Sequence, residues 1–172
     1  EVVRDAQEAL DRGAKELIIT GVNIGYFGRS TGETFLDLLR ALDSLHPTHS
    51  TTLPNTPPHS TTLPNTPPPY RIRISSCEPN LLTDEIIEFV AQSRHFAPHF
   101  HIPLQSGSNQ VLQIMKRRYT RELFAERVQH IRRVMPHAFI GVDCMVGVRG
   151  ETEEYWNDYL AFVKELDVSQ LH

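Results

Sequence analysis

Stretches with the periodicity of a helix alternate with short strand-like runs along most of the 172-residue chain. Val3, Ala6 and Leu10 recur at helical spacing ahead of Gly13, and a strand-like run at 16–20 follows directly. The same reasoning predicts helices at 34–46, 83–92, 108–116, 120–135 and 152–165, and strands at 71–75, 99–103, 138–146 and from 168 onward. Because a helix separates each strand from the next, we expect a parallel α/β sheet with right-handed crossovers.

One segment breaks this alternation. The decapeptide HSTTLPNTPP occurs twice without a change, at 49–58 and 59–68, and eight of the twelve prolines lie between Pro47 and Pro69. Such a composition sustains neither helix nor sheet. We predict that 47–69 is a Pro/Thr-rich tandem-repeat linker inserted in one domain that spans 1–172, and that it is dispensable for folding. A proline-rich ligand for a partner protein is the less favoured alternative.

Composition narrows the class of protein. A chain with 40% hydrophobic residues can bury one sizeable core. It has no apolar run long enough to cross a membrane and no signal-like start, so we expect a cytoplasmic protein with no membrane partner. Cys77 and Cys144 form neither a disulfide framework nor a CxxC pair, which predicts reduced, buried thiols. The chain begins inside a helical pattern without a methionine and stops where a strand begins, which indicates a fragment.

Charge adds one local feature to this picture. The net charge of −4 gives no global attraction to nucleic acid. One segment is locally basic, and its cations are Lys116, Arg117, Arg118, Arg121, Arg127, Arg132 and Arg133. The pattern favours the solvated face of a helix. An RNA-binding surface is the alternative.

Candidate chemistry lies in the loops that follow the strands, because parallel α/β proteins place ligands there. The first loop, at 20–26, has glycines that allow close approach of the backbone to a ligand. The second strand alternates strictly, so Arg71, Arg73 and Ser75 share one face. Two arginines buried on that face would require carboxylates or the anionic groups of a ligand, and we therefore favour a polar, ligand-holding interior over an apolar one.

The third strand carries two histidines. Alternation from 99 to 105 predicts that His99, His101, Pro103 and Gln105 lie together on one face. A His-x-His strand is also a metal-ligand spacing, which makes a metal-dependent barrel hydrolase the main rival interpretation, with Asp143 as an additional ligand. After the last strand, the glycines in 143–152 would suit either a backbone shelf for a purine ring or a tight turn that Thr152 caps.

Taken in order, these loops resemble the radical S-adenosylmethionine (SAM) methylthiotransferases along almost the whole chain outside the linker. HIPLQSGS at 101–108 and MKRRYT at 115–120 are similar to the HxPxQSGS and MxRxYT signatures of that family, and GETEE at 150–154 to its GETEE segment. Residues 17–25 are similar to its LTGxNxG strand and loop. RIRISSCEP at 71–79 resembles the subgroup that acts on tRNA threonylcarbamoyladenosine.

The resemblance implies a partial parallel (β/α)6 radical SAM barrel, an incomplete TIM-barrel-like fold, with the first strand absent from this chain. It further implies S-adenosyl-L-methionine held against a 4Fe–4S cluster, with a second 4Fe–4S cluster in an N-terminal domain. The cofactor-binding residues that it implies lie in or beside the strand-end loops and are Thr20, Gly21, Asn23, Arg73, Ser75, Ser76, Glu78, His101, Gln105, Ser106, Arg117, Val146 and Gly147.

Two departures from the family pattern qualify these expectations. Val148 and Arg149 stand where the family has Phe-Pro, in the loop expected to form the adenine shelf. The CxxxCxxC motif is absent, and two cysteines cannot supply the three thiolates that such a cluster takes. We therefore expect a parent tRNA methylthiotransferase and an isolated chain that is inactive, has no catalytic residue of its own and self-associates through its uncovered first-strand side. The alternative within the class is a methylthiotransferase for a ribosomal-protein aspartate.

Overall fold

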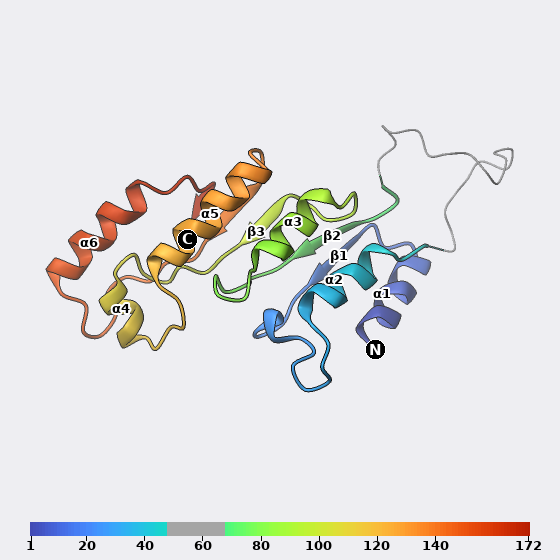
Figure 1. The fold of residues 1–172 in the computed structure, drawn as a ribbon, viewed down its shortest axis with the longest axis horizontal. Coiled ribbons are helices and arrows are strands. Elements are labelled where there is room, and N and C mark those ends of the chain that lie inside the picture. Colours follow the sequence, from blue (N-terminus) through green and yellow to red (C-terminus); the bar gives the residue numbers. More distant parts are fainter. Residues whose placement is uncertain (48–67) are drawn as a thin grey trace, which may run out of the picture.

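The computed structural model describes residues 1–47 and 68–172, so the predicted linker, 47–69, lies outside the described residues except at its ends. The described part is an alternation of helices and strands (Figure 1). In chain order the elements are α1 (Val2–Asp11), β1 (Glu16–Ile19), a 3-10 turn (Ile24–Tyr26), α2 (Phe35–Asp43), β2 (Arg71–Ile74), α3 (Asp84–Gln92), β3 (His99–His101), α4 (Asn109–Ile114), α5 (Arg121–Val134), β4 (Phe139–Val142), α6 (Glu153–Lys164) and β5 (Gln170–Leu171).

The strands lie side by side in chain order and all pairs are parallel. Glu16 pairs with Arg71 at the start of β1 and β2, and β3, β4 and β5 form a second ladder. A bridge between Ser76 and His101 joins the two ladders, as does the bond from the amide of Ile72 to the carbonyl of His95. The described residues therefore form an open, barrel-like parallel sheet, and the predicted fold class is confirmed.

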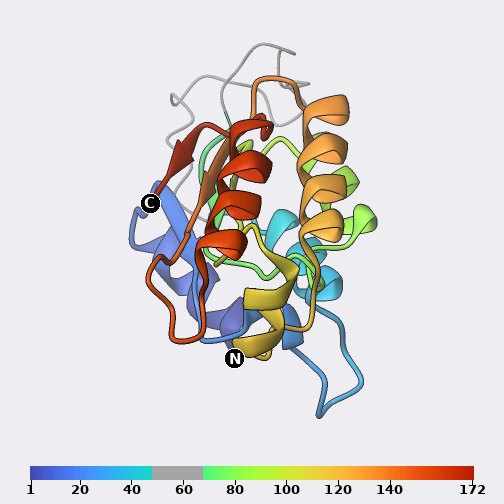
Figure 2. The same cartoon turned by 90° about the vertical axis from the view of Figure 1, so that its left-hand side faces the viewer.

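The helices cover one face of this sheet. Ile72 and Ile74 of β2 point into the helix layer and are almost fully buried. In Figure 2, α5 and α6 stand together on one side of the strands. The other face is the inner face of the open barrel, and part of it is exposed, since Ile18 retains 62% of its accessible surface. A ligand that enters the open barrel would meet this inner face and the loops at the strand ends.

Local sequence signals set the bounds of the helices. Thr34 begins α2 with a capping box, in which its hydroxyl accepts from the amide of Asp37 and the Asp37 carboxylate accepts from the amide of Thr34. Thr83, Thr120 and Thr152 cap three later helices in the same way through their hydroxyls.

Several predicted elements are shorter or less buried in the structure. The third strand ends at His101 rather than at 103, and the fourth ends at Val142 rather than at 146. In both cases the backbone leaves the ladder to form the loops that line the strand ends. The helix predicted at 152–165 was expected to turn Trp156, Tyr159, Leu160 and Val163 inward, but only Tyr159 is buried, because this helix lies at the margin of the core. Within 1–47 and 68–172, no helix is both long and apolar enough to cross a membrane.

Candidate functional site

A pocket of about 400 Å³ opens at the carboxyl ends of β1, β2 and β3. We call it the strand-end pocket. Five of the predicted site residues line it, and they come from four separate loops: Asn23, Ser76, Glu78, Gln105 and Arg117. The other lining residues are Val22, Ile24, Gly25, Leu81, Pro103 and Asp143. The pocket therefore combines polar side chains of both charges with an apolar wall, which is the composition of a small-molecule site.

Arg117 and Glu78 form the charged side of the strand-end pocket. Nη1 of Arg117 lies 3.3 Å from Oε1 of Glu78, and both side chains are largely buried. Nε of Arg117 is buried without a hydrogen-bond partner among the described residues. A buried donor without a partner is energetically unfavourable, which makes Nε of Arg117 a candidate donor to an oxygen acceptor of a ligand.

Arg117 reaches this position because of the way α4 ends. The amide of Arg117 donates to the carbonyl of Leu112, and the amide of Lys116 donates to the carbonyl of Gln113. This pair of bonds is a Schellman motif, in which the residue after the cap adopts a left-handed conformation. Lys116 does so, with φ of 56°. The motif reverses the chain and directs the Arg117 side chain towards the strand-end pocket.

His101 connects β2, β3 and β4 beside the strand-end pocket. Its Nδ1 lies 2.7 Å from Oγ of Ser76 and its Nε2 lies 3.1 Å from Oδ1 of Asp143. Both ring nitrogens thus have protein partners. His101 orients the Ser76 hydroxyl and the Asp143 carboxylate, and it lies on the inner face rather than in the pocket.

Gln105 enters the strand-end pocket through an unusual backbone. It adopts φ of 67°, and it forms a bridge with Cys144 after β3 has ended. Its amide donates to the carbonyl of Asp143. The hydroxyl of Tyr119 stabilises the same loop by donating a hydrogen bond of 2.9 Å to the carbonyl of Pro103. The predicted single face of four residues from 99 to 105 is therefore wrong, because the chain leaves the strand after His101.

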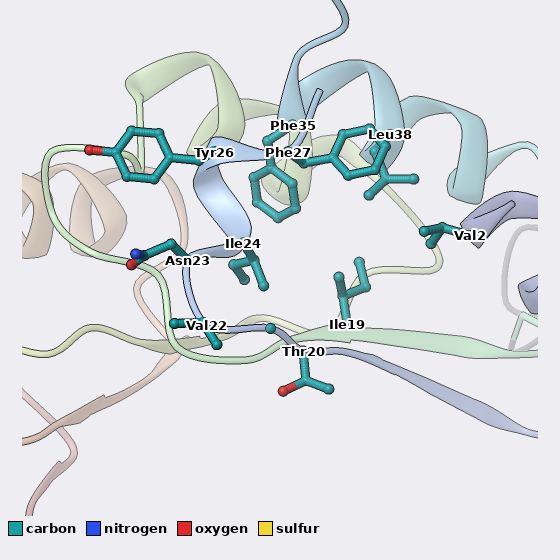
Figure 3. A pocket seen from close by; sticks show the side chains of 11 residues that line it. Val2, Ile19, Thr20, Val22, Asn23, Ile24, Tyr26, Phe27, Phe35 and Leu38 are labelled. Carbon is teal, nitrogen blue, oxygen red and sulfur yellow. The ribbon is translucent and has the colours of Figure 1, made fainter. Parts of the chain in front are cut away.

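The loop after β1 separates the strand-end pocket from an apolar cavity of about 310 Å³ (Figure 3). Thr20 and Gly21, which were predicted to bind cofactor, line this cavity instead, together with Ile24 and Phe35. Figure 3 shows the amide of Asn23 directed away from the apolar side chains. Of the predicted residues in this loop, only Asn23 therefore contributes a polar group to the strand-end pocket.

Arg73 and Ser75 line a hollow on the inner face of the sheet, together with His99 and His101. Arg73 is half-exposed, and its guanidinium lies 2.8 Å from Oε1 of Glu16. Neither arginine is fully buried, and Glu16 is the carboxylate that pairs with both, so this face is polar, as the sequence predicted. Hydrogen bonding from Arg71, opposed by partial desolvation, keeps the pKa of Glu16 below its usual value.

The hydrolase alternative finds no support in the positions of the histidines. His99 stacks on Phe139 with ring centroids 5.0 Å apart, and desolvation lowers its pKa. His101 is held by Ser76 and Asp143. In the part of the chain that the structure describes, no three His, Cys, Asp or Glu side chains are grouped so as to hold a metal ion.

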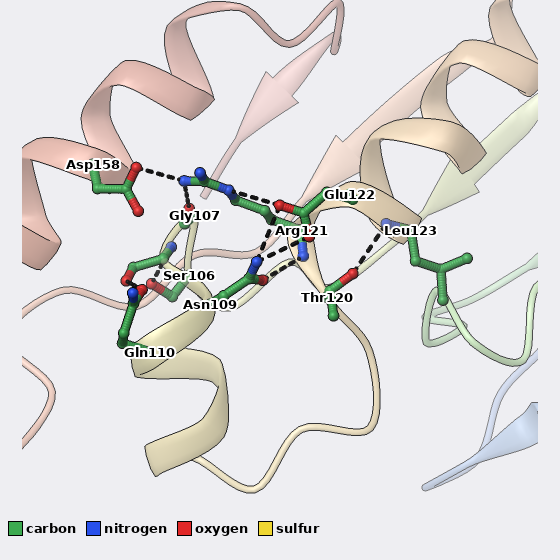
Figure 4. Close-up of polar contacts among 10 residues, drawn as sticks. Ser106, Gly107, Asn109, Gln110, Thr120, Arg121, Glu122, Leu123 and Asp158 are labelled. Atoms are coloured by element: carbon green, nitrogen blue, oxygen red, sulfur yellow. Dashed lines mark hydrogen bonds and ion pairs between the residues drawn. The ribbon is translucent and has the colours of Figure 1, made fainter.

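Ser106 is fully buried, and its hydroxyl accepts a bond from the amide of Ser108. It therefore shapes the loop between β3 and α4 (Figure 4) and does not line the strand-end pocket. Val146 and Gly147 lie in the exposed loop after β4, where the amide of Gly147 donates to the carboxylate of Glu151. Thr152 caps the next helix, so this loop has the geometry of the predicted strand-to-helix turn.

Most of the predicted basic segment is neutralised on the surface. Arg121, Arg127 and Arg132 each pair with a carboxylate, which belongs to Asp158, Asp84 and Asp167 respectively. This supports the interpretation of the α5 cations as a solvated helix face. Cys77 is buried as predicted, whereas Cys144 is only partly buried. Burial raises the pKa of the Cys77 thiol to about 12 and also raises that of Cys144.

Residues that the sequence did not single out for the strand-end pocket also take part. Asp143, considered only as a metal ligand, lines the pocket, and so do Pro103 and Leu81. The signal for Asp143 was its position directly after a strand, which is where parallel sheets place functional groups. No sequence signal marked Leu81, because its approach to Gly25 depends on the packing of two distant loops.

The sequence profile of the Radical SAM superfamily matches residues 1–163. The chain is 37% identical, over its whole length, to the threonylcarbamoyladenosine tRNA methylthiotransferase MtaB of Bacillus subtilis, and it covers 34% of that protein. It is 33% identical, over 96% of its length, to the tRNA-2-methylthio-N(6)-dimethylallyladenosine synthase of Pelotomaculum thermopropionicum, and it covers 32% of that protein. The chain thus spans about a third of the length of these curated relatives.

Proposed function

Since the chain belongs to the Radical SAM superfamily, we propose that it forms part of the core domain, 1–172 with 47–69 as an inserted linker, of a tRNA methylthiotransferase. The substrate proposed is threonylcarbamoyladenosine beside the anticodon, as the name of the Bacillus subtilis relative suggests. A tRNA substrate would place the protein in the cytoplasm. Superfamily membership implies S-adenosylmethionine and a 4Fe–4S cluster. The described residues fit the first of these groups but not the second.

The strand-end pocket fits S-adenosylmethionine. The observation that carries the proposal is the buried, unpartnered Nε of Arg117 on the wall of a pocket of about 400 Å³. The carboxylate of the cofactor is a suitable acceptor for Arg117, and Glu78 is placed to receive a hydroxyl or ammonium group. Asn23 and Gln105 add amides that both donate and accept, which suits a ribose.

The chain's own side chains do not fit a 4Fe–4S cluster. Such a cluster takes three thiolates when its fourth iron is left for the cofactor, and the chain has two cysteines whose pKa values are raised by burial. We propose that the cluster ligands come from outside this chain and that the isolated chain is inactive. When bound, cofactor and cluster supply the radical chemistry, and the residues described here bind and orient.

The remaining sequence predictions enter the proposal with narrower roles. His101 positions Ser76 and Asp143, and Ser106 positions the loop that carries Gln105. Thr20 and Gly21 line the apolar cavity, and Arg73 and Ser75 line the hollow on the inner face. Val146 and Gly147 lie in the exposed loop after β4. Contact between these residues and the cofactor would need a change in the flanking loops. Self-association through the exposed inner face is also proposed.

The proposal is tested in a Bacillus subtilis strain that lacks its threonylcarbamoyladenosine methylthiotransferase. Expression of the gene that encodes this chain, with any coding sequence that flanks it, should restore 2-methylthio-threonylcarbamoyladenosine to tRNA, as measured by mass spectrometry of nucleosides. Appearance of the 2-methylthio-dimethylallyl nucleoside instead would reassign the substrate. No methylthio nucleoside from a protein that carries its cluster would refute the proposed activity.

A further inference from the structure

A second hollow, of about 230 Å³, opens beside the strand-end pocket and shares Asn23, Glu78 and Arg117 with it. Its remaining lining residues are Tyr26, Met115, Lys116 and Arg118. We call it the basic hollow, because it brings together three consecutive cations. The Schellman motif at the end of α4 accounts for their arrangement, since it turns the chain sharply at Lys116.

The outer two cations of the basic hollow are not neutralised by described carboxylates. Lys116 and Arg118 are exposed, and neither forms an ion pair within the described residues. Nη1 of Arg118 instead donates to the hydroxyl of Tyr26 at 3.0 Å. Glu78 is the one carboxylate on the wall of this hollow, and it is paired with Arg117. The described lining therefore carries an excess of positive charge.

Tyr26 gives Arg118 a hydrogen-bond partner and is itself covered by a cation that lies outside the lining of the basic hollow. Figure 3 shows its hydroxyl directed away from the apolar cavity, and therefore towards the side where Arg118 lies. The guanidinium of Arg29 lies over the Tyr26 ring, 5.2 Å from its centroid. This arrangement differs from that of α5, where Arg121, Arg127 and Arg132 are paired with carboxylates.

We propose that the basic hollow binds a backbone phosphate of the RNA substrate. The inference deepens the proposed function, on which it rests for the identity of the polymer. A phosphate is an acceptor for Lys and Arg side chains and needs no specific base. Contact at the mouth of the strand-end pocket would fix the position of the RNA strand relative to the cofactor.

The test measures binding of an unmodified RNA stem-loop to the 172-residue chain, without cofactor, by fluorescence anisotropy at several salt concentrations. Lys116→Gln and Arg118→Gln should each reduce the slope of log K against log salt by about 0.7 to 0.9, the effect of one lost phosphate contact. At 0.1 M salt this corresponds to roughly fivefold weaker binding. Lys164→Gln, which removes an exposed lysine from the last turn of α6, should change neither quantity.

One further variant and one modified RNA identify the group that is bound. Arg118→Lys should restore part of the slope, and RNA with methylphosphonate linkages in the loop should bind weakly to every variant alike. Unchanged slopes for both Lys116→Gln and Arg118→Gln, with melting curves that show folded protein, would overturn the inference. So would tight binding of inorganic phosphate that both substitutions abolish while RNA binding is unaffected. Because no cofactor is present, RNA binding by this hollow can be confirmed even where methylthiotransfer fails.

Discussion

The guanidinium of Arg117 pairs with the carboxylate of Glu78 on one side of the strand-end pocket, with 3.3 Å between Nη1 and Oε1. One nitrogen of Arg117 is thus satisfied while Nε has no described partner. The pair can therefore bind a zwitterionic ligand, because Arg117 attracts its anionic group and Glu78 attracts its cationic group.

Arg117→Gln should weaken the binding of S-adenosylmethionine to the chain by roughly ten- to a hundredfold, since a hydrogen bond to a charged group is worth about 1.5–3 kcal/mol. We expect the unsubstituted chain to bind the cofactor with a dissociation constant above the micromolar range, because this chain does not hold the cluster iron that the cofactor would contact. Titration followed by NMR is suited to this range. Arg40→Gln on the surface of α2 is the control. Micromolar or tighter binding without iron would contradict the expectation.

Gly107→Ala should lower the melting temperature by several degrees. A Cβ at this position would lie 2.6 Å from Cδ2 and 2.9 Å from the carbonyl oxygen of Tyr159, so α6 would have to shift. Overpacking of this kind costs about 1–3 kcal/mol. Gly21→Ala is a milder comparison, because its Cβ would meet only a side-chain methyl of Ile24. Equal melting temperatures for the two variants would show that α6 is not held against the 106–108 loop.

Tyr70→Phe should destabilise the chain by about 1–3 kcal/mol. The buried hydroxyl lies 3.0 Å from the carbonyls of Leu42, in the last turn of α2, and of Leu45, just beyond the helix, and both lose this partner in the variant. Denaturation by urea measures the change, and Tyr155→Phe is the control because its side chain is only partly buried.

Titration of the same tyrosine gives a second readout. Desolvation raises the pKa of Tyr70 to about 12, above its unfolded value near 10. The stability associated with the protonated hydroxyl is therefore complete below pH 10 and is lost as the pH rises towards 12. Tyr70→Phe should reduce the alkaline loss of stability in this interval. An alkaline transition identical to that of the unsubstituted chain would indicate another group.

Glu122→Gln should reduce the sensitivity of the chain to acid. The Asn109 amide, the largest of several causes, holds the pKa of Glu122 at about 2 (Figure 4), below its usual 4.5. The stability that it contributes is present above pH 4.5 and is lost as the pH falls towards 2. The effect should be below about 1 kcal/mol, since the carboxylate is 58% exposed. Glu153→Gln, at the start of α6, is the matched control for denaturation measured at pH 7, 4 and 3.

Ile18→Thr should reduce self-association of the isolated chain. Ile18 lies on the inner face of β1 with 62% of its surface exposed, and exposed apolar groups on an open sheet favour contact between copies. Sedimentation velocity measures the change, with Ile114→Thr on α4 as a comparison of similar exposure. A chain that is monomeric at all attainable concentrations would contradict the proposed self-association.

The order of elements could be predicted from periodicity, because most helices have a capping threonine or an apolar stripe and the strands are short runs that are either apolar or alternate between polar and apolar residues. Register could not. That Glu16 would answer Arg71 and Arg73 depends on the pairing of two strands separated by more than fifty positions, and only the fold determines it. Local sequence therefore indicated that the arginines need a carboxylate, but it did not identify which one.

The sequence predicted which loops form the strand-end pocket better than it predicted which side chains line it. Five predicted residues line it, because loops after parallel strands meet at one edge of a sheet. The alternation of a strand holds only as far as His101, where β3 ends, and Gln105 then adopts a left-handed backbone and lines the strand-end pocket. Pro103 was the available warning, since proline cannot donate to a strand ladder.

The left-handed turn at Lys116 has an implication for how stability and recognition are balanced in this chain. That position after a helix is favoured by glycine, which adopts it without steric penalty, whereas a side chain makes it less stable by about 1 kcal/mol. Lys116→Gly should therefore make the chain more heat-resistant and a poorer partner for RNA. A substitution chosen by thermal screening alone would remove the ammonium group, so a more durable protein would hold its RNA less tightly.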